Sequence, residues 1–167
     1  IGSALPDFTY GITLNASWKG LDLTVFGSGS YGNDIFSLLN RVDRPMGNKL
    51  AVYYENRWTP GKTDAIYPRP GCNDEDKFWM SNAAIFDGSY FKIKQIQLGY
   101  SLPAKWMNKI AVGSLRFYVS LDDWFCFTKY PGMDPEAASY QATSGMGLDK
   151  GAYPMSKKTM FGLNITF

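Results

Sequence analysis

The clearest strand pattern in the chain is the stretch Thr159-Met160-Phe161-Gly162-Leu163-Asn164-Ile165-Thr166-Phe167. Apolar side chains stand at every second position of this stretch, and small or polar ones stand between them. Because successive side chains of a β-strand point to opposite faces, the stretch predicts a strand with one apolar face. Such a strand fits either a membrane-spanning β-barrel or a soluble sheet, and the rest of the chain bears on that choice.

The same alternation recurs in four earlier segments. The run from Phe8 to Lys19 alternates without an error and is about twice the usual strand length of roughly 5–6 residues. A tilted membrane-spanning strand takes roughly 9–11 residues. We therefore expect an all-β chain of five antiparallel strands, with a break in the alternation near Gln95. The expected strands cover about 8–19, 21–32, 90–102, 114–127 and 157–167.

The connections between these strands alternate between short and long. Lys19 and Gly20 form a tight hairpin turn, and 103–113 is a second short connection. The connections 33–88 and 128–154 are long. Outer-membrane barrels have short periplasmic turns and long extracellular loops, whereas a soluble sandwich has no reason for this regularity. The pattern predicts a periplasmic turn at 103–113 and extracellular loops at 33–88 and 128–154.

Five strands do not close a barrel, since the smallest spanning barrels have about eight. Open strand edges cannot face hydrocarbon, because their N–H and C=O groups would lack partners. We therefore expect the chain to be part of a larger barrel. The start at Ile1, without methionine or a signal peptide, agrees with that expectation.

The composition argues against catalysis and against nucleic-acid binding. The chain has no histidine, which removes histidine-based acid–base chemistry, catalytic triads and histidine-containing zinc sites. Asp122 and Asp123 are adjacent in an expected strand and should point to opposite faces; Asp74 to Asp76 should form a solvated turn. The net charge of +2 comes from scattered basic residues. We predict no enzyme, no cofactor and no metal, and leave open whether Cys72 and Cys126 pair.

Aromatic residues crowd the long connection 33–88. Flat rings suit stacking against sugars or apolar peptide side chains, but a loop of this length must also bury something to be ordered. Both interpretations stay open at this point. The candidates for ligand or partner contact are Tyr54, Trp58 and Trp79. In the short connection, 104–110 is typical of an interfacial helical turn with Trp106 at the level of lipid headgroups.

Several stretches, in order along the chain, resemble the SusC/RagA-type TonB-linked outer-membrane proteins. The first is Ile1-Gly2-Ser3-Ala4-Leu5-Pro6-Asp7-Phe8-Thr9-Tyr10-Gly11. Asp122-Asp123 departs from the family, which more often has an amide pair there. The further stretches are Tyr31-Gly32-Asn33-Asp34-Ile35, Arg57-Trp58-Thr59-Pro60, Asp87-Gly88-Ser89-Tyr90-Phe91-Lys92-Ile93-Lys94, Leu98-Gly99-Tyr100-Ser101-Leu102-Pro103, Phe125 to Thr128 with Lys129, Gly132, Asp134, Pro135 and Glu136, and the last strand.

The resemblance implies that residues 1–167 are the C-terminal segment of a 22-stranded transmembrane β-barrel with a plug domain. Such proteins import oligosaccharides or peptides across the outer membrane of Gram-negative bacteria. They work with the TonB complex, through N-terminal regions absent here, and with a SusD-like surface lipoprotein. The last strand is then also the signal for the barrel-insertion machinery, carried by Phe161, Gly162, Leu163, Ile165 and Phe167.

Three hypotheses follow from these observations. The first is a fragment of an energised nutrient transporter in contact with outer-membrane lipid and with the rest of its barrel and plug. The second is an outer-membrane barrel with a passive or scaffold role. The third is a soluble carbohydrate-binding β-sandwich, in which Ile12, Leu23 and Leu163 would lie in a dry interior between two sheets. The residues do not distinguish a glycan from a peptide as the imported molecule.

Overall fold

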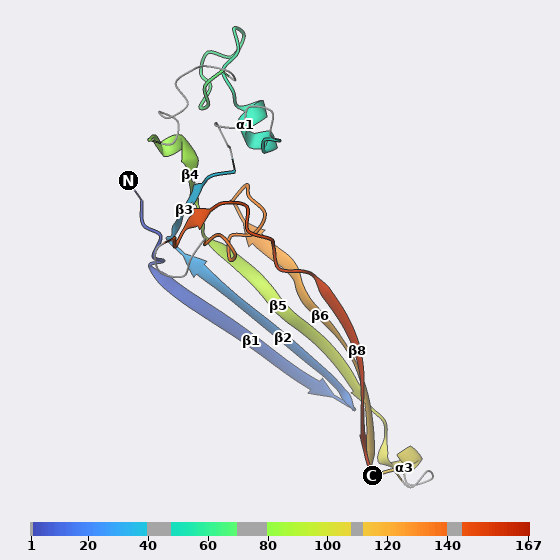
Figure 1. The fold of residues 1–167 in the computed structure, drawn as a ribbon. Helices are drawn as coiled ribbons and strands as arrows, with labels where there is room; N and C mark the ends of the chain where they lie inside the picture. The colour runs from blue at the N-terminus through green and yellow to red at the C-terminus, as the bar shows by residue number, and fades with distance from the viewer. Residues whose placement is uncertain (1, 40–47, 70–79, 108–111, 140–144) are drawn as a thin grey trace. The chain divides into compact units, whose positions relative to one another are not determined.

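A computed structural model describes residues 2–39, 48–69, 80–107, 112–139 and 145–167. The chain divides into two compact units (Figure 1). One, here called the loop unit, comprises Ile1–Phe8, Ser30–Tyr90 and Thr128–Pro154. The other, the sheet unit, comprises Thr9–Gly29, Phe91–Phe127 and Met155–Phe167.

Five long strands form one sheet in the order β1-β2-β5-β6-β8. Every end of these strands lies within one residue of the end expected from the alternation of side chains. The prediction of an all-β chain with five antiparallel strands is therefore confirmed. The strands are β1 (Phe8–Trp18), β2 (Leu21–Tyr31), β5 (Tyr90–Ser101), β6 (Ser114–Thr128) and β8 (Lys158–Thr166).

The register between β6 and β8 matches like faces. Leu115 lies opposite Ile165, Phe117 opposite Leu163, and Val119 opposite Phe161. The intervening positions pair polar or small residues, for example Arg116 with Asn164. Cross-strand pairs of this kind stabilise a sheet, and a slip of one residue would exchange the two faces. The register thus gathers the apolar side chains of both strands on one face.

The hairpin between β1 and β2 turns through two residues with positive φ. The φ angles are 49° at Lys19 and 90° at Gly20, as in the type I′ turn that suits a twisted hairpin. The Gly20 carbonyl accepts a hydrogen bond of 2.7 Å from the Ser101 amide. A Cβ placed on Gly20 would lie 2.7 Å from the Ser101 carbonyl oxygen, so the close approach of β5 also requires glycine.

The alternation of β5 breaks between Phe91 and Gln95. The Phe91 ring lies 2.5 Å from where a Cβ on Gly27 would stand, on the apolar face. Gln95 instead contacts Ser120, and Gly99 lies beneath Arg116, both on the polar face. Positions 91, 95 and 99 are an even number of residues apart, so unbroken alternation would place Phe91 on the same face as Gln95 and Gly99. The break lies where the opposite phase of the two halves of β5 predicts it.

The loop unit contains a second, smaller sheet that the sequence analysis did not predict. Its strands run in the order β4-β3-β7, with β3 (Asp34–Ser37) at the centre. β4 (Ile85–Asp87) pairs with β3 antiparallel, and β7 (Leu148–Asp149) pairs with β3 in parallel. Strands this short carry too little periodicity to predict. The connections 33–88 and 128–154 therefore fold together as one body.

Aromatic side chains form the core of the loop unit. Tyr53, in helix α1 (Ala51–Glu55), packs edge-on against Tyr67 with 4.8 Å between ring centroids. Both rings are buried together with Ala84 of the short 3-10 helix η1 (Asn82–Ala84). Phe86 contacts this cluster and also a second one. The second cluster consists of Ile35, Tyr130 and Ala138.

The short connection after β5 begins with a single helical turn, α3 (Ala104–Met107). The Trp106 side chain is 59% exposed, whereas Met107 is buried. This agrees with the first part of the helical turn expected over 104–110, and residues 108–110 lie outside the described part. None of the helices in the described ranges is long and apolar enough to cross a membrane.

The loop unit should lose stability at alkaline pH. Burial raises the pKa of Tyr53 to about 12 and also raises the pKa of Tyr130, which donates a 2.5 Å hydrogen bond to Asp149. A folded pKa above the unfolded value of about 10 means that the neutral tyrosine stabilises the fold below pH 10. That stability, at most about 3 kcal/mol for Tyr53, is lost as the pH rises from about 10 to about 12.

Tyrosinate absorbance and limited proteolysis, recorded together on the full-length parent protein, measure this loss. Tyr53→Phe is the matched control, because it keeps the buried ring and removes the titrating hydroxyl. If proteolysis began at the same pH in the wild type and in Tyr53→Phe, the loss of stability could not be due to ionisation of Tyr53.

Candidate functional site

The apolar face of the five-stranded sheet is open. Ile12 is 51% exposed, Leu23 37% and Leu163 49%. A soluble sandwich would hold these three side chains in a dry interior between two layers. In the described part of the chain no second layer covers them, so the dry interior that the sandwich hypothesis requires is not present there.

Aromatic rings cross the apolar face at one end of the sheet. Tyr10 of β1 stacks on Phe91 of β5 with 5.9 Å between centroids, and Phe91 stacks on Phe127 of β6 at 6.4 Å. The ring of Phe91 reaches across β2 at Gly27, where a larger residue would block it. Trp18 stands toward the other end of β1, and a strand tilted by about 40° would separate it from Tyr10 by roughly 20 Å of height. This spacing is typical of the two aromatic girdles of a membrane barrel.

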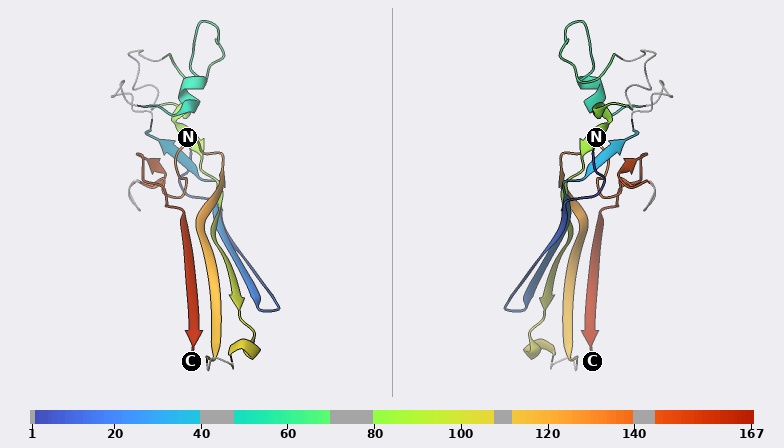
Figure 2. Two further views of the ribbon diagram at one scale, coloured as in Figure 1. Left: turned by 90° about the vertical axis from the view of Figure 1, so that its right-hand side faces the viewer. Right: turned by 90° about the vertical axis from the view of Figure 1, so that its left-hand side faces the viewer.

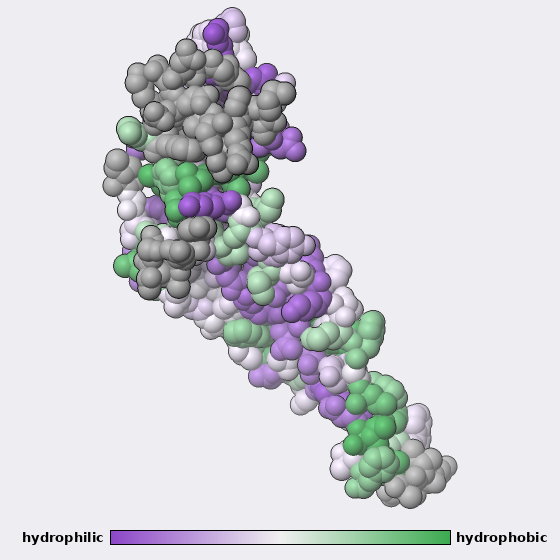
Figure 3. Space-filling model, in the orientation of Figure 1, coloured by the Kyte–Doolittle hydropathy of each residue, from purple (hydrophilic) through white to green (hydrophobic). Residues whose placement is uncertain are grey.

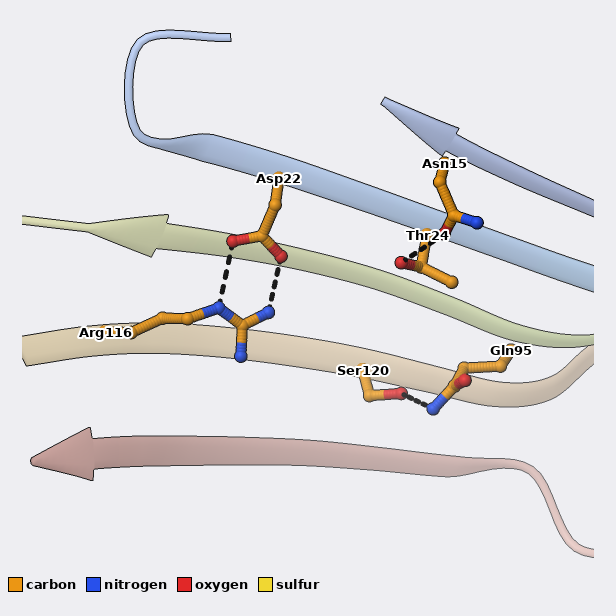
Figure 4. Close-up of polar contacts among 6 residues, drawn as sticks. All are labelled: Asn15, Asp22, Thr24, Gln95, Arg116 and Ser120. Carbon is orange, nitrogen blue, oxygen red and sulfur yellow. Dashed lines mark hydrogen bonds and ion pairs between the residues drawn. The ribbon is translucent and has the colours of Figure 1, made fainter. Parts of the chain in front are cut away.

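The polar face carries an ion pair that skips a strand (Figure 4). Arg116 of β6 donates from Nε and Nη2 to the two carboxylate oxygens of Asp22 in β2, at 2.9 and 2.5 Å. β5 runs between them, and the pair passes over its Gly99. A Cβ on Gly99 would lie 2.6 Å from both Asp22 oxygens. Sequence reasoning missed this site, because it follows from the strand order and register.

Further hydrogen bonds occupy the same face. The Thr24 hydroxyl donates to Asn15 Oδ1 at 3.0 Å. Gln95 Nε2 donates to Ser120 Oγ at 3.5 Å, and Ser120 Oγ donates to Asp122 Oδ1 at 2.6 Å. In the view of Figure 3, polar side chains gather over the middle of the five-stranded sheet and apolar ones toward its lower end. The polar contacts on this face and the exposed apolar side chains on the other face make the sheet amphipathic.

The geometry at Asp122 and Asp123 differs from the regular strand that the sequence analysis assumed. Asp123 has a φ of 56°, so the alternation of β6 is interrupted there and does not by itself assign the two carboxylates to opposite faces. Asp122 accepts a hydrogen bond from Ser120, whereas Asp123 pairs with Lys94 at 3.4 Å. Each carboxylate thus has its own partner within the sheet. Among the described residues, no group of three or more carboxylate or thiol side chains could hold a metal ion.

The predicted insertion-signal residues occupy both faces of β8. Phe161, Leu163, Ile165 and Phe167 are exposed, and the first three lie opposite the apolar residues of β6. Gly162 lies opposite Tyr118, whose ring fills the space that a Cβ on Gly162 would take. The glycine is therefore explained by packing, and the signalling role stays a prediction.

The predicted contact residues of the loop unit have different surroundings. Tyr54 is 64% exposed, and the Arg57 guanidinium lies over its ring at 3.6 Å. Trp58 is 36% exposed, and its amide donates to the Tyr67 carbonyl at 2.8 Å. Tyr53 and Tyr67 are thus core residues, as the packing interpretation of the loop aromatics expects, while the side chains of Tyr54 and Trp58 reach the surface. Trp79, Cys72 and Asp74 to Asp76 lie outside the described residues; Cys126 is exposed.

Gly99→Ala is expected to displace the ion pair between Asp22 and Arg116. Overpacking of this kind should lower the free energy of unfolding of the full-length parent by about 1–3 kcal/mol. The cost should largely disappear when Asp22 and Arg116 are both alanine, because the space is then free. Chemical unfolding of the reconstituted protein measures this loss in the free energy of unfolding in both backgrounds. Gly61→Ala is the control, since a Cβ there meets open space, and an equal cost in both backgrounds would contradict the packing explanation.

Comparisons with known proteins agree with this geometry. No family model matches the chain. It is 32% identical to the TonB-dependent receptor P3 of Formosa agariphila over 173 residues, covering 100% of the chain and 17% of that protein. It is 27% identical to TonB-dependent receptor P26 of the same organism, covering 100% and 18%. To the TonB-dependent receptor SusC of Bacteroides thetaiotaomicron it is 24% identical, covering 96% and 15%.

Solved structures give the same result. A chain of the RagAB peptide importer in the closed-closed state superposes with a TM-score of 0.77 and 26% identity, covering 99% of this chain and 18% of that one. In the open-open state the TM-score is 0.75. The chain therefore spans less than a fifth of the relatives that it matches. Over its whole length, it is homologous to the C-terminal part of the SusC/RagA-type TonB-dependent receptors.

Proposed function

We propose that the chain contributes five strands to a transmembrane barrel in the outer membrane of a Gram-negative bacterium. The observation that carries this proposal is the open apolar face, with Ile12, Leu23 and Leu163 exposed. Exposed apolar side chains gathered on one face of a sheet mark a site of membrane or protein contact. The polar face with Asp22 and Arg116 then lines the interior of the barrel. The edge strands β1 and β8 pair with the other strands of the parent, because unpaired edges are not tolerated in lipid.

The activity that we propose for the parent protein is nutrient import. Its relatives are named TonB-dependent receptors, and the similar solved structures are of a peptide importer. The imported molecule is an oligosaccharide or a peptide, the energy comes from the TonB complex, and a SusD-like lipoprotein is the surface partner. The chain itself acts without catalysis. A passive barrel is the alternative, and it predicts uptake that is independent of TonB.

The loop unit is proposed to lie outside the cell. Its two connections are the long ones, and long connections of outer-membrane barrels are extracellular. The exposed rings of Tyr54 and Trp58 are then available to the partner lipoprotein or to the imported molecule. Growth on candidate glycans and peptides, measured with and without the parent gene and with and without TonB, tests the proposal. Growth that is unaffected by both deletions on every nutrient tested would contradict it.

An arginine at Val25 should destabilise the barrel strongly. Val25 is near the middle of β2 and in phase with Leu21 and Leu23, so the substitution would place a charge in hydrocarbon. Near the bilayer midplane this costs about 2–4 kcal/mol. Denaturant titration in lipid vesicles measures the effect. Ser28→Arg is the matched control on the polar phase of the same strand, and equal costs at the two positions would overturn the assignment of the faces.

The aromatic residues of β8 should be needed for insertion. Phe161→Ser removes an exposed ring of the predicted signal and is expected to reduce the surface amount of the parent protein several-fold. Met160→Ser, on the other phase of the same strand, should leave most of it in place. Surface labelling of intact cells measures both variants. Normal surface levels of the Phe161 variant would count against a signalling role for that ring.

A further inference from the structure

We propose that the end of the sheet unit formed by the β1–β2 turn and α3 binds the phosphate of an anionic phospholipid through Lys19 and Lys105. The proposal rests on the proposed function, because it places this end of the strands at one surface of the bilayer. It adds a lipid preference that a membrane-spanning barrel does not require.

Lys19 occupies a position where lysine is unfavourable. Its φ of 49° lies in the left-handed region, where asparagine or glycine is the usual residue of a hairpin turn. Residues held in such conformations occur often at functional sites. The Lys19 ammonium lies 4.9 Å from the centre of the Trp18 ring, and both side chains are exposed. A cation is thus held beside an aromatic ring at the end of the apolar face.

A second exposed lysine and tryptophan follow β5 directly. Lys105 and Trp106 are exposed on α3. The hydrogen bond from the Ser101 amide to the Gly20 carbonyl fixes the end of β5 to the β1–β2 turn. Lys105 follows Ser101 within roughly 14 Å of extended chain. Figures 1 and 2 show the turn and α3 at the same end of the sheet.

The acidic side chains of the sheet unit are engaged away from the two lysines. Three acidic side chains occur in the sheet unit: Asp22, Asp122 and Asp123. Asp22 is engaged by Arg116 on the polar face. Asp122 lies opposite Lys158 of β8, toward the other end of β6, and Asp123 pairs with Lys94. Lys19 and Lys105 therefore add positive charge that no nearby acidic side chain neutralises.

Two ammonium groups flanked by indoles match the interfacial region of an anionic bilayer. Indole rings prefer the headgroup level, and lysines extend toward phosphates from the ends of membrane-spanning segments. Each lysine near an anionic surface strengthens the association about fivefold. Free phosphate offers the same charge but nothing for Trp18 and Trp106 to contact. The apolar side chains beside the lysines favour the lipid.

The test uses the full-length receptor in nanodiscs of phosphatidylcholine with and without phosphatidylglycerol. Native mass spectrometry, titrated with short-chain forms of both lipids, reports their affinities. The wild type should prefer phosphatidylglycerol, and Lys19→Asn and Lys105→Gln should each weaken its binding about fivefold. Lys62→Gln, in the loop unit, is the control and should change nothing. Inorganic phosphate should displace little lipid.

Lys19→Asn also separates lipid binding from turn structure. Asparagine suits the left-handed position, so the unfolding midpoint should stay the same or rise while the lipid preference falls. Equal binding of both lipids by the wild type, an unchanged preference in a variant that combines Lys19→Asn with Lys105→Gln, or complete displacement by inorganic phosphate would overturn the proposal. Failure of the receptor to enter bilayers at all, seen as loss of the heat-modifiable folded band, would instead refute the proposed barrel.

Discussion

The structure depends on one constraint: all five long strands must place their apolar side chains on the same face of one sheet. The register of β6 and β8 satisfies it, because Phe117 meets Leu163 and Val119 meets Phe161. A slip by one residue would bring Phe161 to the side of Arg116 and Ser120. The positive φ angles of the β1–β2 turn set the phase of β2, and the break in β5 sets the phase of the second half of that strand, so both serve the same constraint.

Glycines at three positions allow large side chains to lie across a neighbouring strand. On the apolar face, Phe91 lies over Gly27; on the polar face, Tyr118 covers Gly162, and the pair of Asp22 and Arg116 passes over Gly99. In each case a Cβ would collide with the crossing group. These glycines therefore act through the space they leave free. The same principle accounts for an ion pair between strands that are not neighbours.

The sheet could be predicted from the sequence because its signal is local and repeated. Alternation over β1, β2, β6 and β8 gives both the strands and the phase of their faces, and the opposite phases of Phe91 and Leu98 give the break in β5. The loop unit could not be predicted, because its pairing joins residues 36–37 to 148–149 across more than half of the chain. The contact of Asp22 with Arg116 needs the strand order, and the irregularity at Asp123 has no sequence pattern that signals it.

The pairing inside the loop unit changes how its two connections must be interpreted. β3 belongs to one connection and β7 to the other, and they share backbone hydrogen bonds such as that from the Phe36 amide to the Gly147 carbonyl at 2.7 Å. Phe86 packs against both aromatic clusters, so neither can rearrange without affecting the other. Tyr54 and Trp58 therefore stand on a body supported by residues of both connections. A substitution at Tyr130 would therefore change the positions of the Tyr54 and Trp58 rings although Tyr130 is not one of the exposed rings. The exposed surface of the two connections thus behaves as a single unit.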